Sequence, residues 1–165
     1  MTKEEIEKNV FRSGVDDTHA LLEQYKIFVD SADKISDRRL KTNEFFLGLN
    51  TAFLALLGLA KSQVVEEEIS VIITLAALGG IAISYLWFHL IRSHKNLNGA
   101  KFKVVHVIEK RLPLSPYHAE WEIVGGGNDK KRYWPFSHIE LIMPWIFVAI
   151  FVTILITKLL HLFVV

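Results

Sequence analysis

No cysteine occurs in the 165-residue sequence. Disulfide bonds, thiolate metal sites and cysteine nucleophiles are therefore excluded. A strong charge imbalance is also missing, because 19 basic and 18 acidic residues leave a formal net charge of +1. Nothing in the overall charge favours nucleic acid as a partner.

The features of a secretory signal peptide are missing too. The first 40 residues are polar and charged, with no apolar h-region and no small-residue cleavage site. We therefore expect the first apolar helix to direct the chain to the membrane and to remain in the protein. No sequence repeat is visible at a period of about 20–50 residues.

Recognisable motifs for catalysis and ligand binding are absent. The 7 histidines are scattered and do not share the spacing of a metal site. The glycines at 125–127 are not followed by Lys-Ser or Lys-Thr, so they predict a turn rather than a phosphate loop. No G-x-S-x-G motif is present. We therefore predict a protein that is not an enzyme and binds no cofactor.

Three apolar blocks supply most of the hydrophobic character of the chain. Hydrophobic residues make up 51% of the sequence, and the mean hydropathy is +0.29. Residues 69–91 carry no formal charge and are followed by Arg92. Residues 139–160 contain Pro144, which we expect in the first or second helical turn. Because about 20 helical residues cross the hydrocarbon core of a bilayer, each block predicts one span.

The remaining block, residues 45–60, is shorter and would be about 24 Å long as a helix. Taken alone, it also fits a buried helix in a soluble core. Residues 42–43 and 64–65 can extend it, and the other two blocks leave no soluble core to bury it. We therefore predict a third span here.

The distribution of basic residues predicts how the chain is oriented. Eight Lys and Arg residues precede the first block, one lies between the first and second, and nine lie between the second and third. Basic loops stay in the cytoplasm. The N-terminus is therefore predicted to be cytoplasmic and the C-terminus periplasmic, in a multi-pass protein of the bacterial inner membrane.

The expected fold is an all-α membrane protein with three transmembrane helices. We divide it into an N-terminal cytoplasmic segment with an amphipathic helix (1–41), a first transmembrane helix with a short outside loop (42–65), a second transmembrane helix (66–92), a cytoplasmic helix with a basic and aromatic loop (93–138), and a third transmembrane helix (139–165). The first span is predicted to continue the amphipathic helix without a break.

An apolar stripe with heptad spacing runs along the amphipathic helix. It consists of Leu21, Tyr25, Phe28, Ala32 and Ile35. The same register continues through Arg39 and Phe46 to Leu56. A helix that continues from the second block through residues 92–111, with Ala100, Val104, Val107 and Ile108 on one face, is the natural cover within the chain. Packing against another copy of the chain fits the pattern equally well.

Polar and small residues inside the apolar blocks are candidate packing contacts. We expect Asn50 to hydrogen-bond between helices, the alternative being a transport role. Glu140 is expected to be an interfacial carboxylate paired with Arg39 or Lys41, the alternative being a proton or ion site. Small residues spaced by four suit a close helix contact, within the chain or between subunits. These are Ala76, Gly80 and Ser84.

Basic and aromatic residues at the expected membrane boundaries are candidate anchors. They are Arg38, Arg39, Arg92, Lys130, Lys131, Arg132, Trp134 and Trp145. Such residues bind anionic lipid headgroups at the bilayer surface. The same residue types would suit nucleic acid, but their position at a bilayer entry favours lipid.

Segments 21–56, 97–121 and 139–145 resemble the RipA-like family of small octameric bacterial inner-membrane proteins. In this chain they read LLEQYKIFVDSADKISDRRLKTNEFFLGLNTAFLAL, LNGAKFKVVHVIEKRLPLSPYHAEW and IELIMPW. The resemblance implies a homo-octamer in the cytoplasmic membrane and transfers no functional residue. A looser resemblance links the chain to SLATT-type effector domains, which have two spans where three are expected here.

The leading hypothesis is a homo-oligomeric integral membrane protein with a structural or assembly role. Its expected partners are the lipid bilayer, anionic lipid headgroups and further copies of itself. The alternative is an oligomeric ion channel or a pore-forming effector. The apolar blocks offer no continuous polar stripe to line a water-filled pore.

Overall fold

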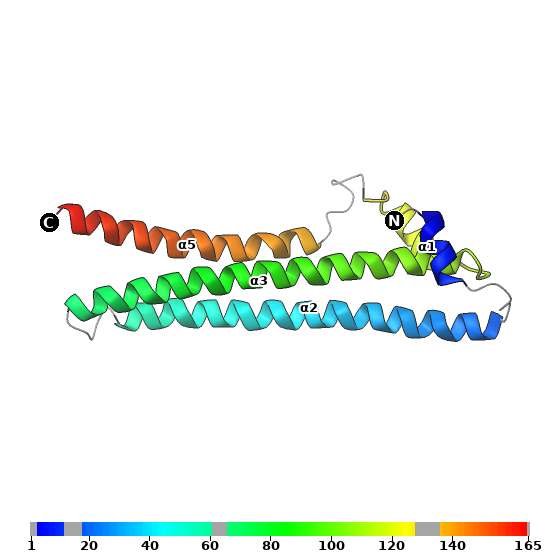
Figure 1. Cartoon of the computed structure of the whole chain (residues 1–165), viewed down its shortest axis with the longest axis horizontal. Coiled ribbons are helices and arrows are strands. Elements are labelled where there is room, and N and C mark those ends of the chain that lie inside the picture. The colour runs from blue at the N-terminus through cyan, green and yellow to red at the C-terminus, as the bar shows by residue number, and fades with distance from the viewer. Residues whose placement is uncertain (1–2, 12–17, 61–65, 128–135, 165) are drawn as a thin grey trace. The chain divides into compact units, whose positions relative to one another are not determined.

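The computed structural model describes residues 3–11, 18–60, 66–127 and 136–164. Every regular element in these ranges is an α-helix (Figure 1). The helices are α1 (Lys3–Val10), α2 (Thr18–Ala60), α3 (Glu66–Glu109), α4 (Pro116–Ile123) and α5 (Phe136–Val164). The all-helical prediction is therefore confirmed for the described part of the chain.

Three helices are long and apolar enough to cross a membrane. They lie at Thr18–Leu59, Ser70–Glu109 and His138–His161. Two of them extend well beyond an apolar block, since α2 has 43 residues and α3 has 44. As predicted, one unbroken helix, α2, runs from residue 18 through the first apolar block. The segment after α3 forms the short helix α4.

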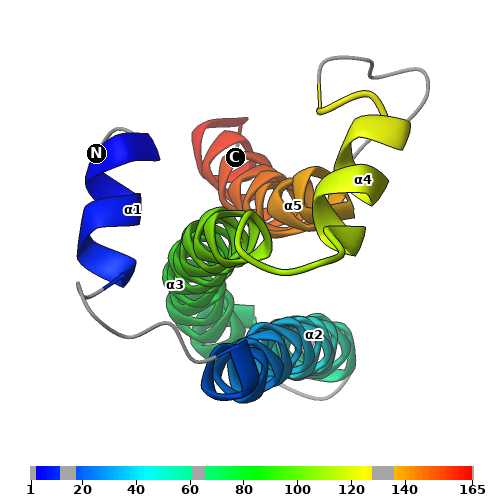
Figure 2. The same ribbon diagram turned by 90° about the vertical axis from the view of Figure 1, so that its right-hand side faces the viewer.

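Contacts within the chain divide it into two compact units. The charged unit comprises residues 1–38 and 94–136, and the apolar unit comprises residues 39–93 and 137–165. In each unit a part of α2 lies beside a part of α3 (Figures 1 and 2). The charged unit adds α1 and α4, and the apolar unit adds α5.

Aromatic side chains form the centre of the apolar unit. Trp87 of α3 stacks on Phe46 of α2, with ring centroids 6.1 Å apart, and its other neighbour is Phe147 of α5 at 6.0 Å. Ile91 completes the buried cluster. The three helices therefore meet around a single tryptophan.

Large apolar side chains also cover the outside of the apolar unit. Exposed Leu, Ile, Val, Phe, Met, Tyr and Trp residues occur on all three of its helices, among them Phe45, Leu75 and Ile156. A water-soluble bundle would carry polar residues at these positions. Lipid tails solvate such a surface without penalty, so this arrangement fits a membrane-embedded unit.

The position of Pro144 corrects one prediction. Because α5 begins at Phe136, Pro144 lies in its third turn and not in the first or second. A proline there lacks the N–H that would bond to the carbonyl oxygen of Glu140, four residues earlier. Pro144 is fully buried in this unit.

Candidate functional site

The predicted intramembrane contact at Asn50 is an interhelical hydrogen bond. The Ser84 hydroxyl of α3 donates to Asn50 Oδ1 of α2 at 2.9 Å. Asn50 Nδ2 donates to the carbonyl oxygen of Phe46 at 2.8 Å. Both side chains are buried. The amide is thus used for packing inside one chain.

A second polar pair, which sequence reasoning missed, lies nearby in the same unit. The indole N–H of Trp87 donates to Asn43 Oδ1 at 2.9 Å. Asn43 precedes Asn50 by one heptad, so both amides lie on the stripe of α2 that faces α3. That spacing was the available signal. A buried indole N–H needs an acceptor, and Asn43 supplies it.

An ion pair joins α2 and α5. Arg39 Nε lies 3.0 Å from Glu140 Oε2, and the side chains are 16% and 5% exposed. Neither atom makes a hydrogen bond of good geometry within the described residues. Of the two predicted partners for Glu140, the structure selects Arg39. The close approach of opposite charges offsets part of the cost of burying both.

The small-residue face of α3 packs against helices of the same chain. The ring of Phe151 in α5 lies on Gly80, where an added β-carbon would collide with the ring. At Gly79, an added β-carbon would lie 3.7 Å from the ring of Phe53 in α2. Ser84 is buried and Ala76 is half-buried. Within one chain, this face is therefore already occupied.

Lys158, near the C-terminal end of α5, bonds to residues near the N-terminal end of α3. Its ammonium group bonds to the carbonyl oxygen of Ser70 and to the Thr74 hydroxyl. A cation inside an apolar helix must find such acceptors or reach water. Here the acceptors come from the same unit.

In the charged unit, the heptad stripe faces α3. Ala32 and Ile35 are buried, and Leu21, Tyr25 and Phe28 are partly buried. The Lys101 ammonium lies 4.6 Å from the centroid of the Phe28 ring. The predicted helical cover is confirmed in part, because Val107 and Ile108 are buried while Ala100 is exposed and Val105 is fully buried instead. The stripe also ends earlier than predicted, since Leu56 is exposed.

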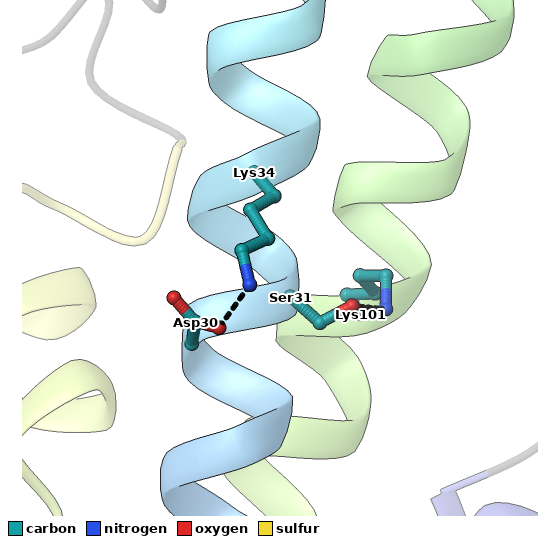
Figure 3. Close-up of polar contacts among 4 residues, drawn as sticks. All are labelled: Asp30, Ser31, Lys34 and Lys101. Carbon is teal, nitrogen blue, oxygen red and sulfur yellow. Dashed lines mark hydrogen bonds and ion pairs between the residues drawn. The ribbon is translucent and has the colours of Figure 1, made fainter.

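Two lysine contacts of the charged unit differ in kind (Figure 3). Lys101 of α3 reaches across to α2 and donates to the Ser31 hydroxyl at 2.7 Å. Lys34 stays on its own helix and pairs with Asp30 at 2.6 Å. The first contact joins two helices, while the second is an exposed i,i+4 pair that contributes little to stability.

Glu109 connects three helices of the charged unit, and sequence reasoning did not single it out. Its carboxylate accepts the Tyr25 hydroxyl at 2.8 Å and the backbone N–H groups of Tyr117 and His118 at 3.0 and 2.9 Å. These two N–H groups lie in the first turn of α4, where a carboxylate is favourable. Burial raises the pKa of Tyr117, with nearby carboxylates adding to the effect. Glu109 therefore fixes the start of α4 against α2 and α3.

Metal-ligating side chains do not gather in the described ranges, where no group of three or more His, Cys, Asp or Glu could hold an ion. The rings of His106 and His118 lie 5.5 Å apart. Glu122 lies 3.6 Å from Nδ1 of His118. The first contact joins α3 to α4, and the second lies within α4.

The candidate anchors lie at several places. Arg38 and Arg92 are exposed, and Trp145 is 50% exposed with its ring 5.4 Å from that of Phe88. Arg39 belongs to the ion pair with Glu140. The other anchors fall outside the described residues; they are Lys130, Lys131, Arg132 and Trp134.

An outward apolar surface, three candidate spans and internally paired polar groups define a multi-pass helical membrane protein. The chain belongs to the octameric membrane protein family (8xMP), whose family model matches residues 22–160. The predicted family resemblance is thereby confirmed, and self-association in a membrane follows from it. No curated protein and no solved structure matches the chain significantly.

Proposed function

We propose that the protein is a homo-octameric integral membrane protein with a structural or assembly role and no enzymatic activity. One observation carries this proposal: the apolar unit exposes large apolar side chains on every helix and pairs its buried polar groups within the chain. Such a subunit presents packing surfaces to lipid and to other subunits. Among the described residues, the buried polar groups of this unit are engaged in contacts between its own helices.

The proposed location is the bacterial inner membrane, with the N-terminus in the cytoplasm and the C-terminus in the periplasm. The support is the distribution of basic residues, eight and nine on one side against one on the other. The charged unit would then lie in the cytoplasm. Arg38 and Arg92, both exposed near the junction of the two units, would contact anionic lipid headgroups.

The mass of the particle in detergent tests the assembly. With the detergent contribution subtracted, we expect eight times the chain mass of 18.9 kDa. Mass photometry or light scattering gives the number directly, and electron microscopy of the same sample shows any central opening. A particle of one or two chains that persists across several mild detergents would contradict the proposal.

The second candidate is an ion channel or pore-forming effector, supported by the looser resemblance to SLATT domains and by membership of an octameric membrane protein family. The side chains argue against a water-filled lining. Exposed Thr51, Thr153 and Thr157 bond to carbonyl oxygens of their own helices, as expected of hydroxyls in an apolar environment. We therefore expect a central space between eight subunits to hold lipid rather than water.

Planar-bilayer recording separates the two candidates. The purified assembly without ligand should show no steady ion conductance. Thr51→Ala serves as a matched control, because it changes an exposed residue of α2 without touching the buried pairs. Reproducible unitary currents whose ion selectivity changes in Asn50→Ala or Glu140→Gln would make the channel the leading hypothesis.

A further inference from the structure

The outer face of α4 is apolar and uncovered within the chain. Ile123 of α4 is 66% exposed and Ala119, one turn earlier, is exposed as well; Leu114, which precedes the helix, is 77% exposed. No residue of α4 is buried. The opposite face is fixed, because Tyr117 lies 5.7 Å from Phe102 ring to ring and the N–H groups of Tyr117 and His118 bond to Glu109. The helix is thus held firmly with its apolar side chains outward.

A second apolar face lies on the paired helices α2 and α3. Ile27 and Leu97 are 67% and 52% exposed. Figure 3 shows the Ser31–Lys101 bond that joins the two helices. Ile27 and Leu97 each lie one helical turn before one of its members, so both are on the side where this bond lies. The side chain of Lys101 contacts the Ser31 hydroxyl and the Phe28 ring, neither of which carries charge.

The two apolar faces lie on different sides of the charged unit. On α3, the residues that contact α4 are Phe102, His106 and Glu109. Leu97 points more than a quarter-turn away from all three, and Lys101 points about 80° or more away from each, because successive helical residues are about 100° apart. Figure 2 shows α4 beside α3 and away from α1 within this unit.

Lipid tails do not explain these faces. Around them, the charged unit carries Glu23, Lys26, Asp30, Asp33 and Lys34 on α2 alone. So many charges exclude this part of α2 from the bilayer core. Exposed Ile27 and Ile123 therefore need another cover.

Membrane insertion limits how eight copies can associate. Copies that enter the membrane in one orientation are related by an axis along the membrane normal, and a closed ring of eight then repeats one heterologous contact. Such a contact joins two different faces of the subunit. The charged unit offers two different apolar faces, on different sides.

We propose that the outer face of α4 in one subunit packs on the Ile27–Leu97 face of the next copy around the octamer. Charge complementarity supports this pairing. Glu120 lies on the outer face of α4, one residue after Ala119, and is exposed. Lys101, one helical turn after Leu97, supplies a cation on the side of the receiving face, where it bonds to Ser31. This inference rests on the proposed octamer and adds where its subunits meet outside the membrane.

Cysteine cross-linking tests the contact cleanly, because the chain has no cysteine of its own. Ile27→Cys and Ile123→Cys are placed in separate chains with different tags and co-expressed, and membranes are treated with a short bismaleimide. We expect a cross-linked pair carrying both tags. Each variant expressed alone should give none. The double variant in one chain should give a ladder that ends at eight chains.

Asp33→Cys provides the matched control for the Ile27 position. Asp33 is exposed on α2, but its charge acts on Tyr117, so it lies on the side of α4 in its own chain. Combined in separate chains with Ile123→Cys, it should give no pair. A strong Asp33 pair with no Ile27 pair would overturn the proposal, as would dimers from Ile123→Cys alone.

The two proposals fail in different ways. A normal eight-chain mass with no Ile27–Ile123 pair would overturn the contact and leave the octamer intact. A cross-linked pair in a ring of another size would support the contact and overturn the octamer. As a second variant, Ile27→Asp should keep its helical circular dichroism and yield smaller particles, whereas an unchanged eight-chain mass would speak against the contact.

Discussion

The ring of Phe151 lies directly on Gly80, so α5 fills the face of α3 that the small residues create. At Gly80 there is no room for a β-carbon unless the ring moves. By contrast, a β-carbon at Gly48 or Gly58 would meet nothing within 4 Å. These glycines of the apolar blocks therefore differ in whether a side chain of another helix packs on them.

Gly80→Ala should destabilise the protein by about 1–3 kcal/mol, since overpacking a buried contact forces a shift of neighbouring groups. Gly48→Ala and Gly58→Ala are the matched controls and should be neutral or slightly stabilising. Unfolding by SDS in mixed micelles, followed by circular dichroism, measures the difference. Adding Phe151→Leu should recover part of the loss. Equal behaviour of all three glycine variants would show that α5 does not pack on α3 here.

Ser84→Ala should cost about 0.6–1.7 kcal/mol, because it leaves the buried Asn50 oxygen without its donor from α3. Thr51→Ala removes a similar hydroxyl that bonds only within its own helix, and it should change stability by less than about 0.5 kcal/mol. The same unfolding assay compares them. A double-mutant cycle with Asn50→Ala should show coupling; strict additivity would mean that the pair is not formed in the bilayer.

Glu109→Gln should loosen α4. The amide keeps one acceptor oxygen for three donors, so at least one buried N–H or O–H loses its partner, at a cost of about 1–3 kcal/mol. Hydrogen exchange in residues 116–123 should become faster. Glu120→Gln, an exposed change on the same helix, should leave exchange unaltered. Similar exchange in both variants would show that Glu109 does not hold α4.

The attachment of α1 should depend on pH. Lys110 donates to Glu7 at 2.9 Å, and this hydrogen bond lowers the pKa of Glu7 below its ordinary value of 4.5. The stabilisation that this ion pair gives to the attachment of α1 is therefore complete above pH 4.5. It is lost as the pH falls through the lowered pKa of Glu7. The fluorescence anisotropy of a label at position 4 should fall on acidification, because α1 becomes more mobile. Lys110→Ala should remove this response, and an unchanged acid response in that variant would assign it to another group.

Single-cysteine labelling tests the predicted orientation. A cysteine at Gly126 in the charged unit should be protected from an impermeant reagent in intact cells and should react after permeabilisation. A cysteine at Gln63, outside the described residues, should react in intact cells. Labelling of the Gly126 variant in intact cells would show that the predicted orientation, or the predicted number of spans, is wrong.

Much of the fold could be predicted from local patterns. An apolar block of helical length predicts a span wherever it occurs, because the bilayer imposes the length. The run of α2 from the amphipathic segment into the first span follows from an unbroken heptad pattern. Glu140 was expected to pair with Arg39 or Lys41, and only the approach of α5 to α2 selected Arg39.

The sequence by itself determined that this chain has three apolar helices, that two of them extend beyond their apolar blocks, and that one stripe of α2 needs a cover. These properties depend on composition and period along one helix. The tertiary structure alone decided the partners: Tyr25 with Glu109, 84 residues apart, and Asn43 with Trp87, 44 apart. The physical reason is that rotation of each long helix about its axis and its axial offset from its neighbours are set jointly by all the packed side chains.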